Sequence, residues 1–358
     1  MFLFKKKLHL YLYIFFLVLF FFFNEFSTNR AFSKNFKVTQ VKINEYYDLN
    51  FDKSKVIDRA FIKAFTILNY QILEKKDQSK LNKITLEEIK NLIENFSIID
   101  EKFINKEYQS EFEVQFNRKK VLNFIERENL VSSLPKKIKI FMLPVLIDIR
   151  SNELYLLNEN ILFNNWNIDS EKYFLINYVL PNEDIEDYLI IRKNINNIEN
   201  YNFDEIIRKY NLDNYIILIA LKDNDILRIF SKIKFGKKNM LMNNFFNKIN
   251  ISNDESINNL IMNIKGHYED KWKSLNKINT SIALPIRLAT DSKNFELSKK
   301  LEKKLLSLDL VSDFKIEKIN NEVIIYKIIY NSGPDSFLEN MLSSKFKIDT
   351  SSVPWRLK

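Results

Sequence analysis

The sequence predicts a multidomain chain of α+β and α/β type, and three observations predict it. Some segments alternate apolar and polar residues, as half-buried strands do, while others repeat apolar residues every three or four positions, as one face of a helix does. A third kind of segment is apolar without interruption, which is typical of strands buried on both faces. We expect a small N-terminal α+β domain (residues 34–133), a central mixed α/β sheet domain (135–276) and a C-terminal ferredoxin-like domain (280–358).

Residues 1–33 have the layout of a signal peptide or an N-terminal anchor. Lys5, Lys6 and Lys7 precede an apolar run over residues 8–23, and Ala31-Phe32-Ser33 offers a cleavage position with small residues. The run is shorter than the about 20 residues that span a bilayer as a helix, so we expect cleavage, with retention as the alternative. The lysines favour a cytoplasmic start, so the body is expected in the periplasm, free or anchored to the inner membrane.

In the first block we expect one sheet with helices against one face. Residues 36–43 alternate as a strand with a possible bulge, and a helical apolar stripe runs from Lys53 to Ile72. Thr85 and Glu88 form a capping box for a helix that we expect to bury residues as far as Phe96. The remaining predicted elements are two strands and a helix, over residues 98–104, 108–116 and 121–125.

The second block favours helices layered on a buried sheet. Its predicted strands are almost continuously apolar and cover residues 138–149, 174–180 and 215–221. A further strand over residues 225–235 is expected to pair with the last of these through the tight turn Lys222-Asp223-Asn224. Helices over residues 203–210 and 256–275 supply the covering layers.

The third block has the predicted order β-α-β-β-α-β of a ferredoxin-like sandwich. Its first strand alternates from Ile282 to Leu288, and Pro285 favours an edge position or a bulge there. A helix stripe from Leu297 to Leu308 follows. The remaining predicted elements are two strands, a helix after Gly333-Pro334 and a short closing strand, over residues 314–319, 323–330, 337–342 and 346–348.

Composition excludes several chemistries. The chain has no cysteine, three glycines and two histidines, so disulfides, zinc sites and glycine-rich phosphate loops are not expected. Cleavage would remove His9, and we expect His267 to be a surface helix residue, with a catalytic base as the alternative. The net charge is +9, but the sequence contains no basic stripe with interleaved aromatic residues, so we expect no nucleic-acid partner. No catalytic residue, cofactor or metal is predicted, and we expect no enzyme.

Carboxylates are the remaining candidates for chemistry. After the second buried strand come Glu183, Asp184, Glu186 and Asp187, and we expect Asn182 to cap a helix whose first turn holds these acids. A calcium or magnesium site is the alternative for this segment.

Asp148, Asp184 and Asp223 each follow a buried strand. Ligands of open α/β sheets bind beyond the carboxyl ends of strands, so these three side chains could converge. A hydrolase or metal-binding protein that uses this cluster is therefore an alternative function.

The three tryptophans are expected to be structural. Trp166 is predicted to pack a loop against the sheet, with a ligand platform as the alternative. Trp272 belongs to the apolar stripe of a helix, and Trp355 is expected to pin the C-terminal tail.

Several short motifs resemble a family of exported proteobacterial proteins known as a domain of unknown function, DUF2066. They are Met142-Leu143-Pro144-Val145, Leu154-Tyr155, residues 160–166, residues 178–187, Tyr330-Asn331-Ser332-Gly333 and Trp355. Ile161 and Leu162 stand where the family has Pro-Trp, and Asn165 replaces Ala. The resemblance implies an envelope location and supplies no catalytic residue.

We therefore expect an exported, periplasm-facing envelope protein that acts through protein or cell-wall contacts. Its partner would be an envelope protein or a cell-wall component, with membrane contact only through residues 1–33 if they are retained. A membrane-tethered scaffold is a further alternative.

Overall fold

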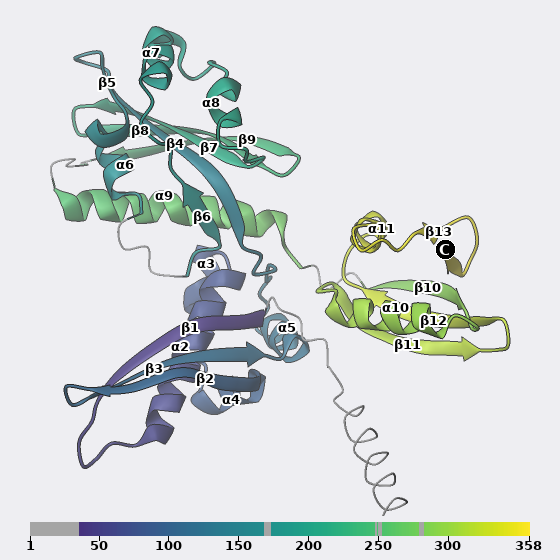
Figure 1. Cartoon of the computed structure of the whole chain (residues 1–358). Helices are drawn as coiled ribbons and strands as arrows, with labels where there is room; N and C mark the ends of the chain where they lie inside the picture. The colour runs from purple at the N-terminus through teal and green to yellow at the C-terminus, as the bar shows by residue number, and fades with distance from the viewer. Residues whose placement is uncertain (1–35, 168–172, 248, 250–252, 279–282) are drawn as a thin grey trace, which may run out of the picture. The chain divides into compact units, whose positions relative to one another are not determined.

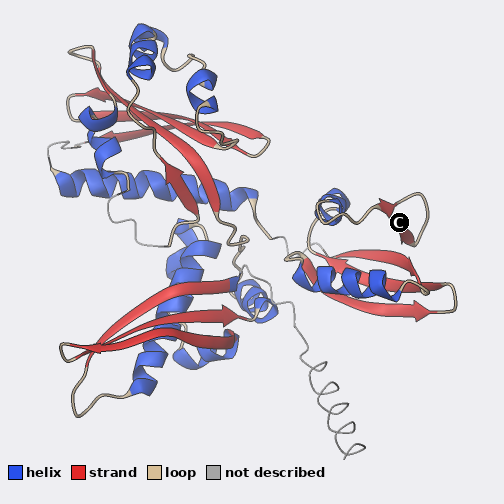
Figure 2. Cartoon of the chain, viewed as in Figure 1, coloured by secondary structure: helices blue, strands red, loops and turns tan. Residues whose placement is uncertain are grey.

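The computed structural model describes residues 36–167, 173–247, 249, 253–278 and 283–358, which form a mixed α/β fold with three sheets (Figure 2). The predicted signal peptide or anchor at residues 1–33 lies outside the described residues. The chain divides into two compact units, and the boundary between them follows Ser281. Among the described helices, none is both long enough and apolar enough to cross a membrane.

The first sheet of the larger unit is antiparallel, in the order β1-β3-β2 (Figure 1). Its strands are β1 (Lys37–Tyr46), β2 (Ile93–Ile104) and β3 (Glu107–Phe116). The register of β1 shifts between Val38 and Val41, which confirms the predicted bulge.

Helices cover one face of this sheet, as the first block predicts. They are α2 (Lys53–Ile72), α4 (Leu86–Leu92) and α5 (Arg118–Arg127), with the short α3 (Lys75–Gln78) and η2 (Ser79–Leu81) between the first two. The capping box of Thr85 and Glu88 is present. The prediction that its helix reaches Phe96 is wrong, because the chain after Leu92 pairs along β3 instead.

The second sheet has six strands in the order β5-β4-β7-β8-β9, and β6 also pairs with β4. They are β4 (Ile138–Asp148), β5 (Glu153–Tyr155), β6 (Ile176–Val179), β7 (Tyr215–Asp223), β8 (Ile226–Phe235) and β9 (Lys238–Asn247). Since β6 pairs with the start of β4 and β5 with its end, these two short strands share one edge of β4.

Helices lie on both faces of this sheet, as its uninterrupted apolar strands predict. Figure 1 shows α9 (Asp254–Leu275) along one face, with α7 (Ile185–Lys193) and α8 (Asp204–Arg208) over the other. The short α6 (Ile161–Asn165) packs on the α9 side, and η3 (Leu157–Glu159) and η4 (Ile195–Asn197) complete the connections.

The turn after β7 differs from the expectation. Asp223 already pairs with Ile226, so the turn consists of Asn224 and Asp225, with Asn224 at φ 53°. The strands β5 and β9 are additional to the predicted ones. Polar residues interrupt β9, and this obscures its pattern in the sequence.

The smaller unit is one sheet with two helices, in the strand order β11-β12-β10-β14-β13. Its elements are β10 (Leu284–Asp291), α10 (Phe295–Ser307), β11 (Val311–Ile319), β12 (Val323–Tyr330), α11 (Pro334–Leu342), β13 (Ile348–Asp349) and β14 (Trp355–Leu357).

Two details of the C-terminal prediction need comment. β10 is a central strand of the sheet, but the expected edge position holds locally at Pro285, because β14 pairs only with Leu288 and Ala289, beyond the proline. The predicted closing strand at residues 346–348 begins at Ile348, and the place beside β10 belongs to β14, which runs parallel to it.

Candidate functional site

The structure does not bring Asp148, Asp184 and Asp223 together as a metal site. Among the described residues no group of three or more His, Cys, Asp or Glu side chains could hold a metal ion. Each carboxylate has its own cation instead: Asp148 pairs with Lys222 at 2.7 Å, Asp184 with Lys209 at 2.6 Å and Asp223 with Arg150 at 2.7 Å. Asp148 and Asp223 lie at the neighbouring ends of β4 and β7, whereas β6, the strand before Asp184, pairs only with the start of β4.

The electrostatics of these carboxylates also argue against acid catalysis. The hydrogen bond from Lys222 holds the pKa of Asp148 below its usual value, and the one from Lys209 does the same for Asp184. A general acid requires a carboxyl that keeps its proton near neutral pH. Asp148 and Asp184 are therefore held as anions, each by its lysine partner.

The acidic segment before α7 forms a helix start, but Asn182 is not its cap. The cap is Asp184, whose carboxylate accepts from the main-chain N–H of Glu186 at 2.8 Å. The Lys209 ammonium donates to Asp184 and also to Asp187, at 2.6 and 2.7 Å. It takes the place that a bound cation would have in the alternative interpretation.

The tryptophans pack in or against the apolar cores, and the histidine lies on a helix. Trp166 is fully buried at the end of α6, Trp272 donates through Nε1 to the Lys136 carbonyl at 2.6 Å, and Trp355 lies in β14. His267 is half-buried on α9.

A row of buried charges on α9 is the feature that the sequence analysis missed. Lys265, Glu269 and Lys273 follow each other at intervals of four residues, and their exposed fractions are 1%, 3% and 3%. Charged residues are almost never this buried without partners. Their spacing beside the apolar stripe was visible in the sequence, but solvated helix faces show the same pattern.

Two members of the row form hydrogen bonds with main-chain groups. Lys273 donates to the carbonyls of Tyr70 and Leu73, at 2.5 and 2.9 Å, where α2 ends. Glu269 accepts from the N–H of Ile176 at 2.8 Å, where β6 begins. Burial raises the pKa of Glu269 and lowers the pKa of Lys273, while their mutual attraction opposes both shifts.

Lys265 has a different environment. Its ammonium donates to the Trp166 carbonyl at 2.5 Å and lies over three aromatic rings, 5.5 Å from the centres of Trp166 and Tyr178 and 5.7 Å from that of Phe174. The ring faces attract the cation but accept no conventional hydrogen bond. Burial lowers the pKa of Lys265 to about 8, and the charge of Glu269 limits that shift.

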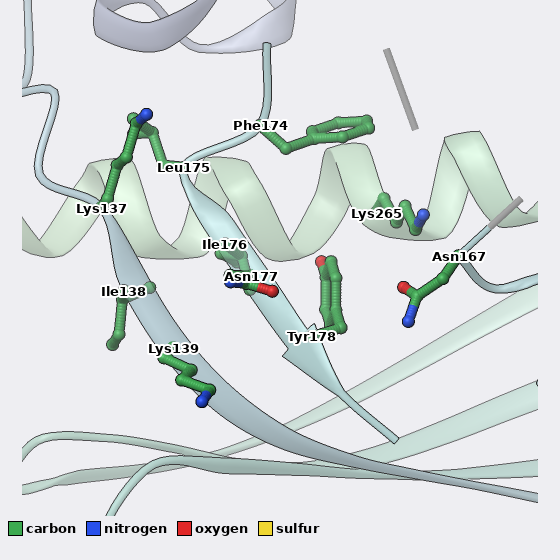
Figure 3. A pocket seen from close by; sticks show the side chains of 10 residues that line it. All are labelled: Lys137, Ile138, Lys139, Asn167, Phe174, Leu175, Ile176, Asn177, Tyr178 and Lys265. Carbon is green, nitrogen blue, oxygen red and sulfur yellow. The ribbon is translucent and has the colours of Figure 1, made fainter. Parts of the chain in front are cut away.

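Lys265 lines a cavity of about 540 Å³, called the Lys265 cavity below. Figure 3 shows Lys265, Tyr178, Asn167 and Phe174 on one side of β6, while Lys137 extends from the start of β4 on the other. The Tyr178 hydroxyl is buried and has no hydrogen-bond partner among the described residues. Burial holds the pKa of Tyr178 well above its usual value, so the hydroxyl keeps its proton.

A second cavity, of about 340 Å³, lies between α2 and α9. The rings of Tyr70 and Tyr173 stack beside it, 5.5 Å apart and nearly parallel. It is lined by Glu269 and Lys273, whose polar atoms already serve the main chain as described above. The Lys265 cavity is therefore the better candidate for a ligand.

No protein-family model matches this chain, and no curated protein matches it either. The resemblance to DUF2066 rests on the short motifs alone and stays a prediction.

Proposed function

We propose that this chain is an exported, periplasm-facing envelope protein that acts without catalysis, through contacts with another envelope protein or a cell-wall component. The signal-like layout of residues 1–33 supports the location. The observation that carries the contact function is the open edge of β2.

Strand β2 is long, exposed and paired on one side only. In the described part of the chain it pairs with β3 over residues 93–104, and no strand lies on its other side. Ile99 and Phe103 have exposed fractions of 54% and 60%. Such an edge presents unpaired N–H and C=O groups, which are a template for an added strand.

The open face of the same sheet is less suited to contact. Lys37 pairs there with Glu113, and Lys42 with Glu111, so the face carries partnered charges. Solvated ion pairs of this kind add little to binding. The contact is therefore placed at the edge of β2.

The finer organisation is part of the same proposal. We infer three domains over residues 34–133, 135–276 and 280–358, with membership of the DUF2066 family. The last is a ferredoxin-like module, and the strand order β11-β12-β10-β14 supports this assignment although β14 runs parallel to β10.

The test is site-specific photocrosslinking in the cell that makes the protein. A photoreactive residue at Phe103 should give a discrete adduct, while one at the equally exposed Leu342 on α11 serves as the control. Equal labelling at both positions, or no adduct at Phe103, would contradict a contact at β2.

A membrane-tethered scaffold is the second candidate, because the apolar run of residues 8–23 is bounded by charged residues. The N-terminal sequence of the mature protein separates the two. A start near residue 34 supports the freely exported form, and an intact N-terminus with membrane association supports the scaffold.

A further inference from the structure

We propose that the Lys265 cavity binds a small organic monocarboxylate, with the carboxylate at Lys265 and Tyr178 and an apolar body against Phe174. This binding site is independent of the contact function proposed for β2.

The first argument is the incomplete hydrogen bonding of a buried cation. A lysine ammonium has three N–H donors, and the described residues provide Lys265 with a single acceptor, the Trp166 carbonyl. A buried charge is costly unless it is paired and hydrogen-bonded. The nearest carboxylate on the same helix, Glu269, faces the start of β6 and does not line the cavity.

The second argument is an unpartnered hydroxyl at the same cavity. Tyr178 is 7% exposed, and its hydroxyl has no partner among the described residues. Buried polar groups are hydrogen-bonded in the great majority of cases, so an exception requires an explanation. Because the Lys265 ammonium lies 5.5 Å from the centre of the Tyr178 ring, one ligand group can reach both donors.

The sign and number of charges indicate a monoanion. Among the described residues, three lysines and no acidic residue line the Lys265 cavity. Of these lysines, Lys137 and Lys139 are exposed, and Lys265 is the buried one. One buried cation neutralises one negative charge, whereas a dianion would leave a buried charge uncompensated.

The apolar part of the lining indicates the rest of the ligand. Phe174, Leu175 and Ile176 contribute to the wall next to the Tyr178 ring. The cavity volume of about 540 Å³ falls in the range of small-molecule sites. A carboxylate on an aromatic or branched apolar body matches both the donors and the wall.

The experiment is isothermal titration calorimetry of the full chain with three isosteric probes at pH 7. They are 2-naphthoate, the neutral 2-naphthamide and the cationic 2-naphthylmethylamine. We expect saturable one-to-one binding of the carboxylate, at least about tenfold tighter than that of either other probe. Its affinity should fall as the pH rises above about 8, where Lys265 loses its proton.

Four variants locate the site. Lys265→Met should weaken naphthoate binding by about tenfold or more, and Tyr178→Phe by about fivefold. Lys139→Met, an exposed lysine of the same lining, and Tyr268→Phe, a buried tyrosine outside it, should each stay within about threefold of the parent.

Three results would overturn the proposal: equal affinity for the amide or the amine, no saturable naphthoate binding at millimolar concentration, or full affinity in Tyr178→Phe. The last decides the question even if Lys265→Met does not fold, because removing an unpartnered hydroxyl leaves the core intact.

Discussion

Lys273 on α9 donates a hydrogen bond of 2.5 Å to the main-chain carbonyl of Tyr70, which lies in the last turn of α2. The same ammonium also reaches the Leu73 carbonyl, so one side chain satisfies two acceptors that a helix end leaves open. A cation at a helix C-terminus is also favoured by the helix dipole. This contact joins segments 200 residues apart in the sequence.

Lys273→Met should therefore destabilise the larger unit. The substitution keeps the stem but removes the Lys273 donor from the Tyr70 carbonyl and leaves Glu269 without its nearest cation, at a cost of roughly 3 kcal/mol. The Leu73 carbonyl keeps the hydrogen bond that it accepts from the Gln78 side chain. Urea unfolding of the variant measures the loss. Lys271→Met, an exposed lysine on the same helix, is the control and should stay within about 0.5 kcal/mol. Equal stability of the two variants would show that the hydrogen bonds of Lys273 do not stabilise the larger unit.

Two buried tyrosines should respond oppositely to loss of their hydroxyls. Tyr178→Phe removes an unpartnered group and should stabilise the ligand-free protein by about 1 kcal/mol. Tyr268→Phe breaks the 2.7 Å hydrogen bond to Ser231, which is fully buried, and should cost about 1–2 kcal/mol. Thermal and urea unfolding measure both. A loss of stability in Tyr178→Phe would mean that its hydroxyl has a partner.

The pH dependence of stability should carry the signature of Lys265. Its pKa in the folded state is about 8, against an ordinary value of 10.5, so between these values the unfolded chain binds more protons than the folded one. The free energy of unfolding should then rise with pH across this window, by up to about 3 kcal/mol. Below the window, the destabilisation caused by burying the charged Lys265 ammonium should be fully present.

The measurement is the difference in unfolding free energy between the parent and Lys265→Met from pH 7 to pH 10.5, which cancels titrations common to both. The facing groups are Glu269, Lys273 and Tyr178, and the Tyr178 hydroxyl stays neutral here because burial raises its pKa. A difference that does not change with pH would rule out the lowered pKa of Lys265.

Among the asparagines of the central sheet region, Asn160 should cause the largest loss of unfolding free energy when it is replaced by alanine. It is fully buried, donates to the Pro144 carbonyl at 3.0 Å and accepts from the Leu162 N–H at 2.9 Å as the cap of α6. Asn160→Ala should cost about 2 kcal/mol in urea unfolding. The exposed Asn200→Ala serves as the control, with an expected change within about 0.5 kcal/mol. A matching loss in both variants would refute the capping role.

Local patterns predicted the elements whose signals are strong. The capping box at Thr85, the stripe of α2 and the strand β12 needed no tertiary information, because hydrogen bonding between neighbours and apolar periodicity determine them. Weak signals failed. The end of α4 at Leu92 and the position of β14 depend on pairing with strands elsewhere in the chain.

The candidate site shows the same contrast between what local sequence patterns predict and what pairing with distant segments determines. The sequence identified Asp148, Asp184 and Asp223 as following buried strands, but it could not show that β6 pairs only with the start of β4. It also contained Lys265 beside an apolar stripe, where a solvated lysine is the ordinary interpretation.

By itself, then, the sequence determined the mixed α/β class, the stripes and caps of its clearest elements and the absence of cysteine, which leaves no residue for a disulfide. Only the tertiary structure decided which charges are buried and which partners they have. The physical reason is that periodicity reports on which face of an element is apolar. Burial of a single ammonium such as that of Lys265 depends instead on Trp166, Phe174 and Tyr178, three rings of one stretch of chain that the fold brings to a lysine far away in the sequence.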